Sequence, residues 1–166
     1  MRKSYNYLIL FFTLSSVIVK AQDYDSIKDG DIKINNFSLD QTTSSLVTIL
    51  GTPSSIGSYH NEVDEEDWLE FKYGLSSFYF FNTKLVSFEL KDSSFYLNNP
   101  LIKVGNAIDS IYTVFESSFN NKDVLNNLGF INIDIVMPDG TLSDTNIVIN
   151  YDPSTNNITS IHFGSN

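Results

Sequence analysis

The stretch Asp67–Leu90, DWLEFKYGLSSFYFFNTKLVSFEL, decides the fold because apolar and polar residues alternate along most of it. Alternation with a period of two is typical of strands that bury one face and expose the other. The pattern predicts strands at about Asp67–Tyr73, Ser77–Phe81 and Leu85–Lys91, with a hairpin turn between the last two. We therefore expect an antiparallel sheet with its apolar side covered.

The same arrangement recurs later in the chain. Strands are predicted at about Phe130–Val136, Asn146–Tyr151 and Ile158–Phe163. The closing segment LVSFEL, residues 85–90, aligns with ITSIHF, residues 158–163, at a constant offset of 73. A second match, at an offset of 65, lies upstream of the strands in each half. Because the two matches occur in the same order in both halves of the chain, the sequence predicts an internal duplication.

That upstream match consists of two segments with apolar residues at helical spacing, Gln41–Leu50 and Ala107–Phe115. Gly51 and Pro53 favour a helix end after the first segment. The fold class predicted is α+β. It has two tandem repeats, each a short helical segment plus about three antiparallel strands, with helices layered on one face of the sheet. The boundaries predicted are 31–92 for repeat 1, 93–100 for a joint and 101–166 for repeat 2.

The segment LVTILGTPSS, Leu46–Ser55, resembles the helix that ends in a leucine-glycine-x-proline turn in two related groups of proteins. These are the β-lactamase inhibitor protein and the outer-membrane assembly lipoproteins known as SmpA/OmlA, which have tandem helix-plus-sheet modules. The second repeat lacks counterparts of Gly51 and Pro53. The resemblance implies an exported module that binds proteins and has no catalytic machinery.

The N-terminal residues have the layout of a secretory signal peptide. Arg2 and Lys3 precede an apolar run of about 13 residues, too short for a membrane-spanning helix of roughly 20, and a small residue stands at Ala21. The sequence predicts cleavage after Ala21, a mobile leader at 22–30, and export to the periplasm or the medium. The chain has no cysteine, which excludes disulfides, thiol catalysis and a lipid anchor on cysteine.

Net charge favours some partners over others. The predicted signal peptide holds three of the 10 basic residues and none of the 20 acids. The mature chain therefore has 20 acids against 7 bases, a net charge of −13. Such a charge disfavours nucleic acid and anionic lipid as partners, and it indicates either a cationic partner or simply high solubility.

The most acidic segment is HNEVDEEDWLEF, His60–Phe71. A calcium site, paired catalytic acids and a solvated turn are the alternatives. Calcium loops need alternating acids around a glycine, which is missing here, so only weak calcium binding stays open. Neighbouring acids on one turn lack the burial that tunes a catalytic acid. The segment is predicted to be a charged turn that leads into a strand.

No other motif predicts catalysis. His60 and His162 lack zinc spacing, and no nucleophile elbow or phosphate-binding glycine loop is present. We therefore predict no metal, no cofactor and no enzyme activity. A hydrolase that uses scattered carboxylates is the third and least favoured interpretation.

Alternation along the strands places some polar and aromatic residues on the side away from the core. Tryptophan and tyrosine on a polar face are the residues expected to anchor an interface, and the alternative is a solvated sheet face that needs no partner. The partner-binding residues predicted are Trp68, Glu70, Lys72, Tyr79, Glu89, Asp134 and His162. The function predicted is that of an exported, acidic, non-enzymatic protein-binding module, such as an inhibitor or immunity-like protein for a cationic target. The alternative is an accessory or scaffolding protein of the cell envelope.

Overall fold

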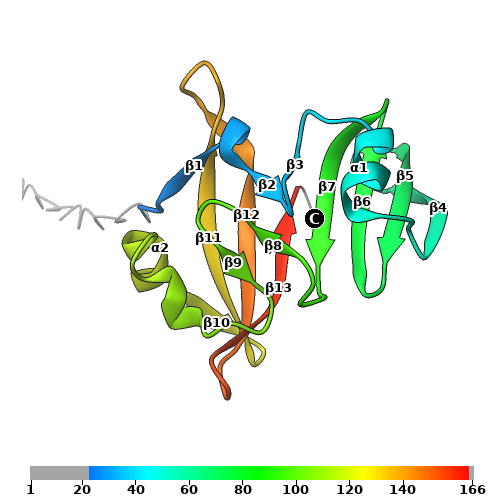
Figure 1. The fold of residues 1–166 in the computed structure, drawn as a ribbon. Coiled ribbons are helices and arrows are strands. Elements are labelled where there is room, and N and C mark those ends of the chain that lie inside the picture. The colour runs from blue at the N-terminus through cyan, green and yellow to red at the C-terminus, as the bar shows by residue number, and fades with distance from the viewer. Residues whose placement is uncertain (1–22, 165–166) are drawn as a thin grey trace, which may run out of the picture.

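The fold is known from a computed structural model, which describes residues 23–164 of the 166-residue chain. The predicted signal peptide lies outside the described residues. Two β-sheets make up most of the described part, and the smaller sheet lies across one face of the larger (Figure 1).

The larger sheet has nine strands, and eight of them follow one another in the order β1-β11-β12-β13-β7-β6-β5-β4, while β10 pairs with β11. Only the pairing of β1 with β11 is parallel. The strands are β1 (Ser26–Lys28), β4 (Ser55–Asn61), β5 (Glu66–Tyr73), β6 (Ser76–Phe81), β7 (Lys84–Leu90), β10 (Asp123–Leu125), β11 (Leu128–Val136), β12 (Leu142–Asp152) and β13 (Asn157–Phe163).

The smaller sheet consists of four two-residue strands in the order β3-β2-β8-β9. Its centre joins segments far apart in sequence, since Ile34 lies opposite Leu97. Both side chains are buried, so the small sheet contributes to the core. Its strands are β2 (Lys33–Ile34), β3 (Phe37–Ser38), β8 (Tyr96–Leu97) and β9 (Ile102–Lys103).

The predicted α+β fold with helices layered on one sheet face is wrong. In the described residues the α-helices are α1 (Thr43–Leu50) and α2 (Glu116–Asn120), with short 3-10 turns η1 (Asp29–Asp31) and η2 (Ile108–Ile111). The small sheet, together with α1, takes the place of the predicted helical layer (Figure 1). The chain is therefore mostly β.

The prediction of a second helix failed for a local physical reason. The segment predicted as the second helix, Ala107–Phe115, is rich in β-branched and aromatic residues, which lose side-chain freedom in a helix. It forms only the four-residue turn η2, followed by the five-residue helix α2. By contrast, α1 has a capping side chain at Thr42, whose Oγ1 accepts a hydrogen bond from the Ser45 amide, and it ends at Gly51 with φ of 88°.

The two closing strands that match in sequence lie side by side at the middle of the large sheet. Glu89 of β7 is opposite His162 of β13, and the flanking pairs are Phe88 with Phe163 and Leu90 with Ile161. In the sequence alignment Phe88 matches Ile161 and Leu90 matches Phe163. In the antiparallel sheet, Phe88 instead lies opposite Phe163, and Leu90 lies opposite Ile161. The repeat boundaries at 31–92 and 101–166 stay a prediction. Residues 26–28, assigned to a mobile leader, form β1.

The predicted alternation of apolar residues is confirmed by the burial of most of them, whereas Leu69, predicted to face the core, is 43% exposed. Every second side chain from Ile131 to Ile135, and from Ile147 to Tyr151, is buried. On the other half of the sheet, Phe78 and Phe88 are fully buried, and both lie in the same core cluster as the residues of the small sheet. The core therefore fills the space between the two sheets, which leaves the other side of the large sheet for the polar residues.

Candidate binding face

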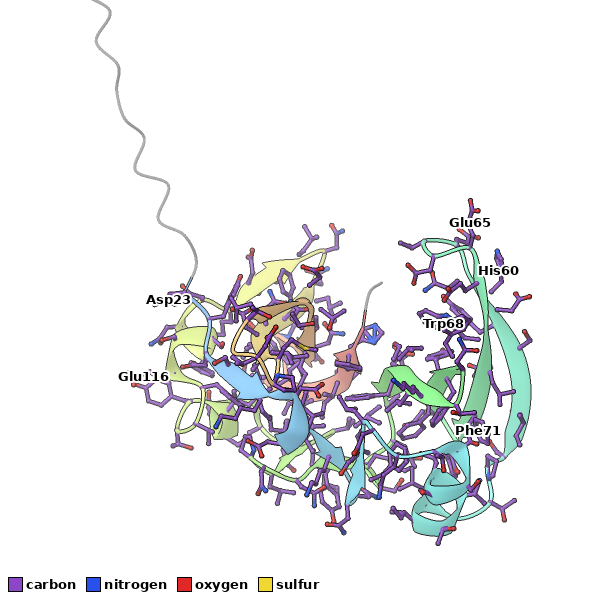
Figure 2. All side chains as sticks on the ribbon, turned by 90° about the horizontal axis from the view of Figure 1, so that it is seen from above. Asp23, His60, Glu65, Trp68, Phe71 and Glu116 are labelled. Carbon is purple, nitrogen blue, oxygen red and sulfur yellow. The ribbon has the colours of Figure 1, made fainter. Side chains whose placement is uncertain are left out.

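We call the side of the large sheet that faces away from the small sheet the open face. Figure 2 shows that the sheet curves strongly and that Trp68 points toward the inside of the curve. Strand alternation and register place the side chains of β5, β6, β7 and β13 that face away from the core on this side. They include six of the seven predicted binding residues: Trp68, Glu70, Lys72, Tyr79, Glu89 and His162.

An aromatic cluster lies at the β4–β5–β6 end of the open face. The ring centroids of Tyr59 and Tyr79 are 4.9 Å apart, and those of Trp68 lie 6.0 Å from Tyr59 and 6.3 Å from Tyr79. The packing leaves Trp68 only 6% exposed, whereas Tyr59 is 44% exposed. Trp68 is therefore the base of the cluster, and the tyrosines offer more of its contact surface.

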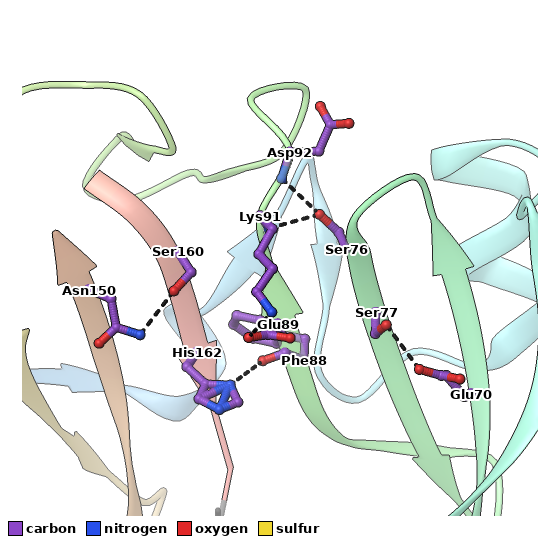
Figure 3. A network of polar contacts seen from close by, with 10 residues as sticks. All are labelled: Glu70, Ser76, Ser77, Phe88, Glu89, Lys91, Asp92, Asn150, Ser160 and His162. Carbon is purple, nitrogen blue, oxygen red and sulfur yellow. Dashed lines mark hydrogen bonds and ion pairs between the residues drawn. The ribbon is translucent and has the colours of Figure 1, made fainter. Parts of the chain in front are cut away.

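A row of polar side chains continues from this cluster toward the centre of the sheet (Figure 3). The Glu70 carboxylate accepts a hydrogen bond from Ser77 Oγ at 3.0 Å and lies 3.2 Å from Lys72 Nζ. The Glu89 carboxylate lies 2.8 Å from Lys91 Nζ. Both carboxylate side chains are only partly exposed, at 14% for Glu70 and 28% for Glu89. The lysines are more exposed, at 48% for Lys72 and 46% for Lys91, so the cationic side of each pair faces solvent.

The Tyr79 phenol joins the aromatic and the acidic parts of the face. Burial raises the pKa of Tyr79, and the charges of Glu70 and Glu89 raise it further, although the Ser77 hydrogen bond opposes this. A hydrogen bond with the Glu70 side chain also raises this pKa, so Tyr79 stays protonated at neutral pH and its hydroxyl is linked to the acidic part of the face.

His162 lies at the centre of the row, opposite Glu89. Its Nδ1 is 3.2 Å from the Phe88 carbonyl oxygen, an arrangement in which the protonated nitrogen donates. Burial lowers the pKa of His162 below its ordinary value of 6.5, although Glu89 opposes this effect and Lys91 adds to it.

This shift predicts a loss of stability in mild acid. Because His162 binds a proton less readily in the folded than in the unfolded chain, the free energy of unfolding is unaffected above pH 6.5 and falls as the pH drops below that value. The imidazole resonances in an NMR titration should give a midpoint below 6.5 for His162. In chemical denaturation, His162→Gln should reduce the decline in stability between about pH 6.5 and 5.

Several carboxylates titrate outside this window and serve as an internal control. Hydrogen bonds from Ser94, Thr141 and Ser154 lower the pKa values of Asp92, Asp139 and Asp152, respectively, below 3.8. Their protonation therefore affects stability only in stronger acid. An unchanged pH profile for His162→Gln between pH 6.5 and 5 would contradict the assignment.

One predicted residue lies away from the others. Asp134 is on β11 and pairs with Asn146 of β12, so β12 separates its strand from that of His162. Two residues of the face were not predicted, Tyr59 and Lys91. Tyr59 was missed because β4, SIGSYHN, contains glycine and serine, which give a weak strand signal. Lys91 ends the predicted strand Leu85–Lys91 but is not among the predicted binding residues.

The acidic segment forms the predicted charged turn. Residues 62–65 connect β4 to β5, and Glu65 adopts a positive φ of 54°. Asn61 closes the turn through its side-chain Oδ1, which accepts a hydrogen bond from the Val63 amide at 2.8 Å. The turn and the strand β5 that follows it position Trp68 on the open face.

Neither a metal-binding cluster nor a membrane-spanning helix is found in the described part of the chain. Residues 23–164 contain no group of three or more acidic or histidine side chains placed to hold a metal ion. Within the same range, none of the helices is both long enough and apolar enough to span a bilayer.

Comparisons with known proteins add little to this geometry. No family model matches the sequence, and no curated protein matches it. Among solved structures, an extracellular protein containing a SCP domain from Bacillus anthracis str. Ames matches 77% of this chain, with a TM-score of 0.43 and 12% identity. The match covers 44% of that protein, and a likeness at this level carries no argument about function.

Proposed function

We propose that the mature chain is an exported, non-enzymatic module that binds a cationic protein through the open face. The observation that carries the proposal is the combination of the Tyr59–Trp68–Tyr79 cluster with the carboxylates of Glu70 and Glu89 on one side of the sheet. Aromatic side chains with a rigid, water-excluding base are typical of interface hot spots. An inhibitor or immunity-like role is consistent with this mode of binding.

Charge supports a basic partner. The net charge of the mature chain is −13, which accelerates association with cationic surfaces and slows association with anionic ones. On the face itself, Glu70 and Glu89 are already paired with Lys72 and Lys91. An arginine from a partner can replace such a lysine, because its planar guanidinium binds a carboxylate with two hydrogen bonds and also stacks on aromatic rings.

Export rests on the sequence of residues 1–21, which has the layout of a signal peptide. The resemblance to the β-lactamase inhibitor protein and the SmpA/OmlA lipoproteins, carried by Leu46–Ser55, supports a protein-binding role outside the cytoplasm. The second candidate, an accessory protein of the cell envelope, would use the same face against an envelope protein.

Binding measurements with variants of neighbouring residues test the proposal. The mature chain, residues 22–166, is immobilised and exposed to a panel of purified basic exported proteins, with acidic proteins of similar size as controls. We expect at least one basic protein to bind, with an affinity that falls as salt is added. Trp68→Ala and Tyr79→Ala should each weaken that binding at least ten-fold, because truncating a hot-spot aromatic costs about 2 kcal/mol or more.

Leu69→Ala is the matched control. Leu69 follows Trp68 on β5 but lies on the opposite side of the sheet, where it is 43% exposed. This change should leave the affinity within about two-fold. Thermal unfolding of each variant separates a loss of contact from a loss of fold. If no basic protein binds, or if Leu69→Ala weakens binding as much as Trp68→Ala does, the open face is not the binding site. If an envelope protein of neutral charge binds with the same dependence on Trp68, the second candidate replaces the first.

A further inference from the structure

One edge of the large sheet lacks the features that normally prevent sheets from joining. β4 is the last strand in the sheet order, and its seven residues pair with β5 in a continuous register without a bulge. Six of the seven are exposed, and the strand contains no proline, lysine or carboxylate. About half of the backbone N–H and C=O groups of an edge strand point away from its neighbour and can pair with another strand.

The opposite edge is protected. There β1 and β10 share β11 as their neighbour, and each has only three residues. Each also carries a charge, at Lys28 and Asp123. Short and charged edge strands are the usual means of blocking sheet extension. The contrast within one sheet identifies β4 as the edge available for pairing.

From this edge we propose that two copies of the chain associate through antiparallel pairing of β4 with β4 of the second copy, centred on Ser58. This inference uses the edge strand of the sheet, and β4 contributes one residue, Tyr59, to the aromatic cluster of the open face. An antiparallel pair of identical strands has two-fold symmetry and forms a closed dimer, whereas pairing β4 with the opposite edge would produce an open filament.

Side-chain fit favours this register. With Ser58 on the two-fold axis, Gly57 lies opposite Tyr59 of the second copy, and Ile56 lies opposite its His60. The glycine leaves space beside it, since nothing lies within 4 Å of a Cβ built on Gly57. The Tyr59 ring packs inward against Tyr79, with centroids 4.9 Å apart, so neither residue of the Gly57–Tyr59 pair blocks the approach of a second backbone. Ile56 is 57% exposed in the single chain and would be partly covered in the dimer.

Charge is compatible with a second copy in spite of the net charge of −13. The nearest acid of the turn, Glu62, is four residues from Ser58, so the two Glu62 residues would lie about 26 Å apart on opposite sides of the axis. Charges separated by more than a Debye length of about 8 Å are largely screened at physiological salt. The uncharged strand therefore forms the contact, and the acidic turns lie at its two ends.

Single cysteines test both the dimer and its register, because the natural chain has none. With Ser58→Cys, the two Cα atoms would lie about 4.5–5.5 Å apart, which suits a disulfide. With Ser55→Cys on the same strand they would lie about 20 Å apart. Under mild oxidation we expect the first variant to form a covalent dimer at least ten times faster than the second. Equal rates for the two variants would overturn the proposed register.

Self-association of the natural chain is measured by sedimentation equilibrium. The interface is small, so the dimer should appear between about 10 μM and 1 mM. Ser58→Lys would bring two like charges together on the axis and should raise the dissociation constant of the dimer at least ten-fold. Thr48→Lys, at an exposed position of α1, makes the same change in charge away from β4 and should leave the constant unchanged.

The dependence on salt separates this dimer from binding of a cationic partner. Added salt screens repulsion between two acidic copies and should strengthen the dimer, whereas it should weaken binding of a basic protein to the open face. A natural chain that stays monomeric at 1 mM in both low and high salt would overturn the dimer and leave the proposed function untouched.

Discussion

Phe88→Ala is expected to lower the free energy of unfolding by about 3–5 kcal/mol, the usual cost of removing a buried aromatic ring. Phe88 is fully buried and lies at the junction of β7 with β13, where the two halves of the sheet meet. Its ring stacks on Phe163 with centroids 5.3 Å apart and also lies 6.4 Å from Phe78. Alanine would leave a cavity at the one place where β7 and β13 hold the two halves of the sheet together.

Urea or guanidinium unfolding measures this loss. Leu75→Ala removes a side chain of similar apolar character from the turn between β5 and β6, where it is 73% exposed, and should change stability by less than about 0.5 kcal/mol. Domains of this size have total stabilities of about 5–15 kcal/mol, so the Phe88 variant is expected to lose a large part of its folded population on mild heating. A loss below about 1 kcal/mol would mean that the junction of β7 and β13 does not depend on this ring.

Gly129→Ala is the second substitution with a large expected effect, about 2–3 kcal/mol of destabilisation from overpacking. Gly129 of β11 lies directly opposite Tyr151 of β12. A Cβ at Gly129 would lie 2.2 Å from Cζ of the Tyr151 ring, so the ring would have to move. Tyr151 is only 3% exposed, and burial raises the pKa of its phenol. The ring therefore has little space into which it can shift.

A double-mutant cycle with Tyr151 isolates the cause. Once Tyr151→Ala has removed the ring, adding Gly129→Ala should cost much less than it does in the natural chain. Gly57→Ala is the matched glycine control, because β4 offers open space around the new methyl group. Additive effects of Gly129→Ala and Tyr151→Ala, measured by chemical unfolding, would show that the glycine is needed for another reason.

Most strands of the large sheet could be predicted from the sequence. The prediction Asp67–Tyr73 differs from β5 only at its first residue, and Ile158–Phe163 differs likewise from β13. Apolar residues two positions apart, such as Phe71 and Tyr73 or Ile161 and Phe163, indicate these strands, and such alternation depends only on local spacing. The strands that were missed, β1, β4, β10 and those of the small sheet, are short or contain glycine and serine. They form because a neighbouring strand supplies their hydrogen bonds, which no local pattern reveals.

The candidate site was also predicted only in part, because local alternation reveals the side of a strand but not its neighbours. Alternation placed Trp68 and Tyr79 on one side of the sheet, and their rings do contact each other. The sequence could not predict that Trp68 would be 6% exposed, because the third ring of the cluster belongs to Tyr59 on a strand that was missed. Contacts between strands also brought Glu89 beside His162, residues 73 positions apart in the chain.

The sequence by itself determined the period of most strands of the large sheet, the side of the sheet on which residues such as Trp68 and Tyr79 lie, and the acidic charge. These follow from the order of neighbouring residues along the chain. Only the tertiary structure decided that β7 pairs with β13, that a second sheet covers the core in place of a helical layer, and that β4 is left as an edge. The physical reason is that pairing between distant strands depends on the packing of the whole core, and several pairings satisfy the same local pattern.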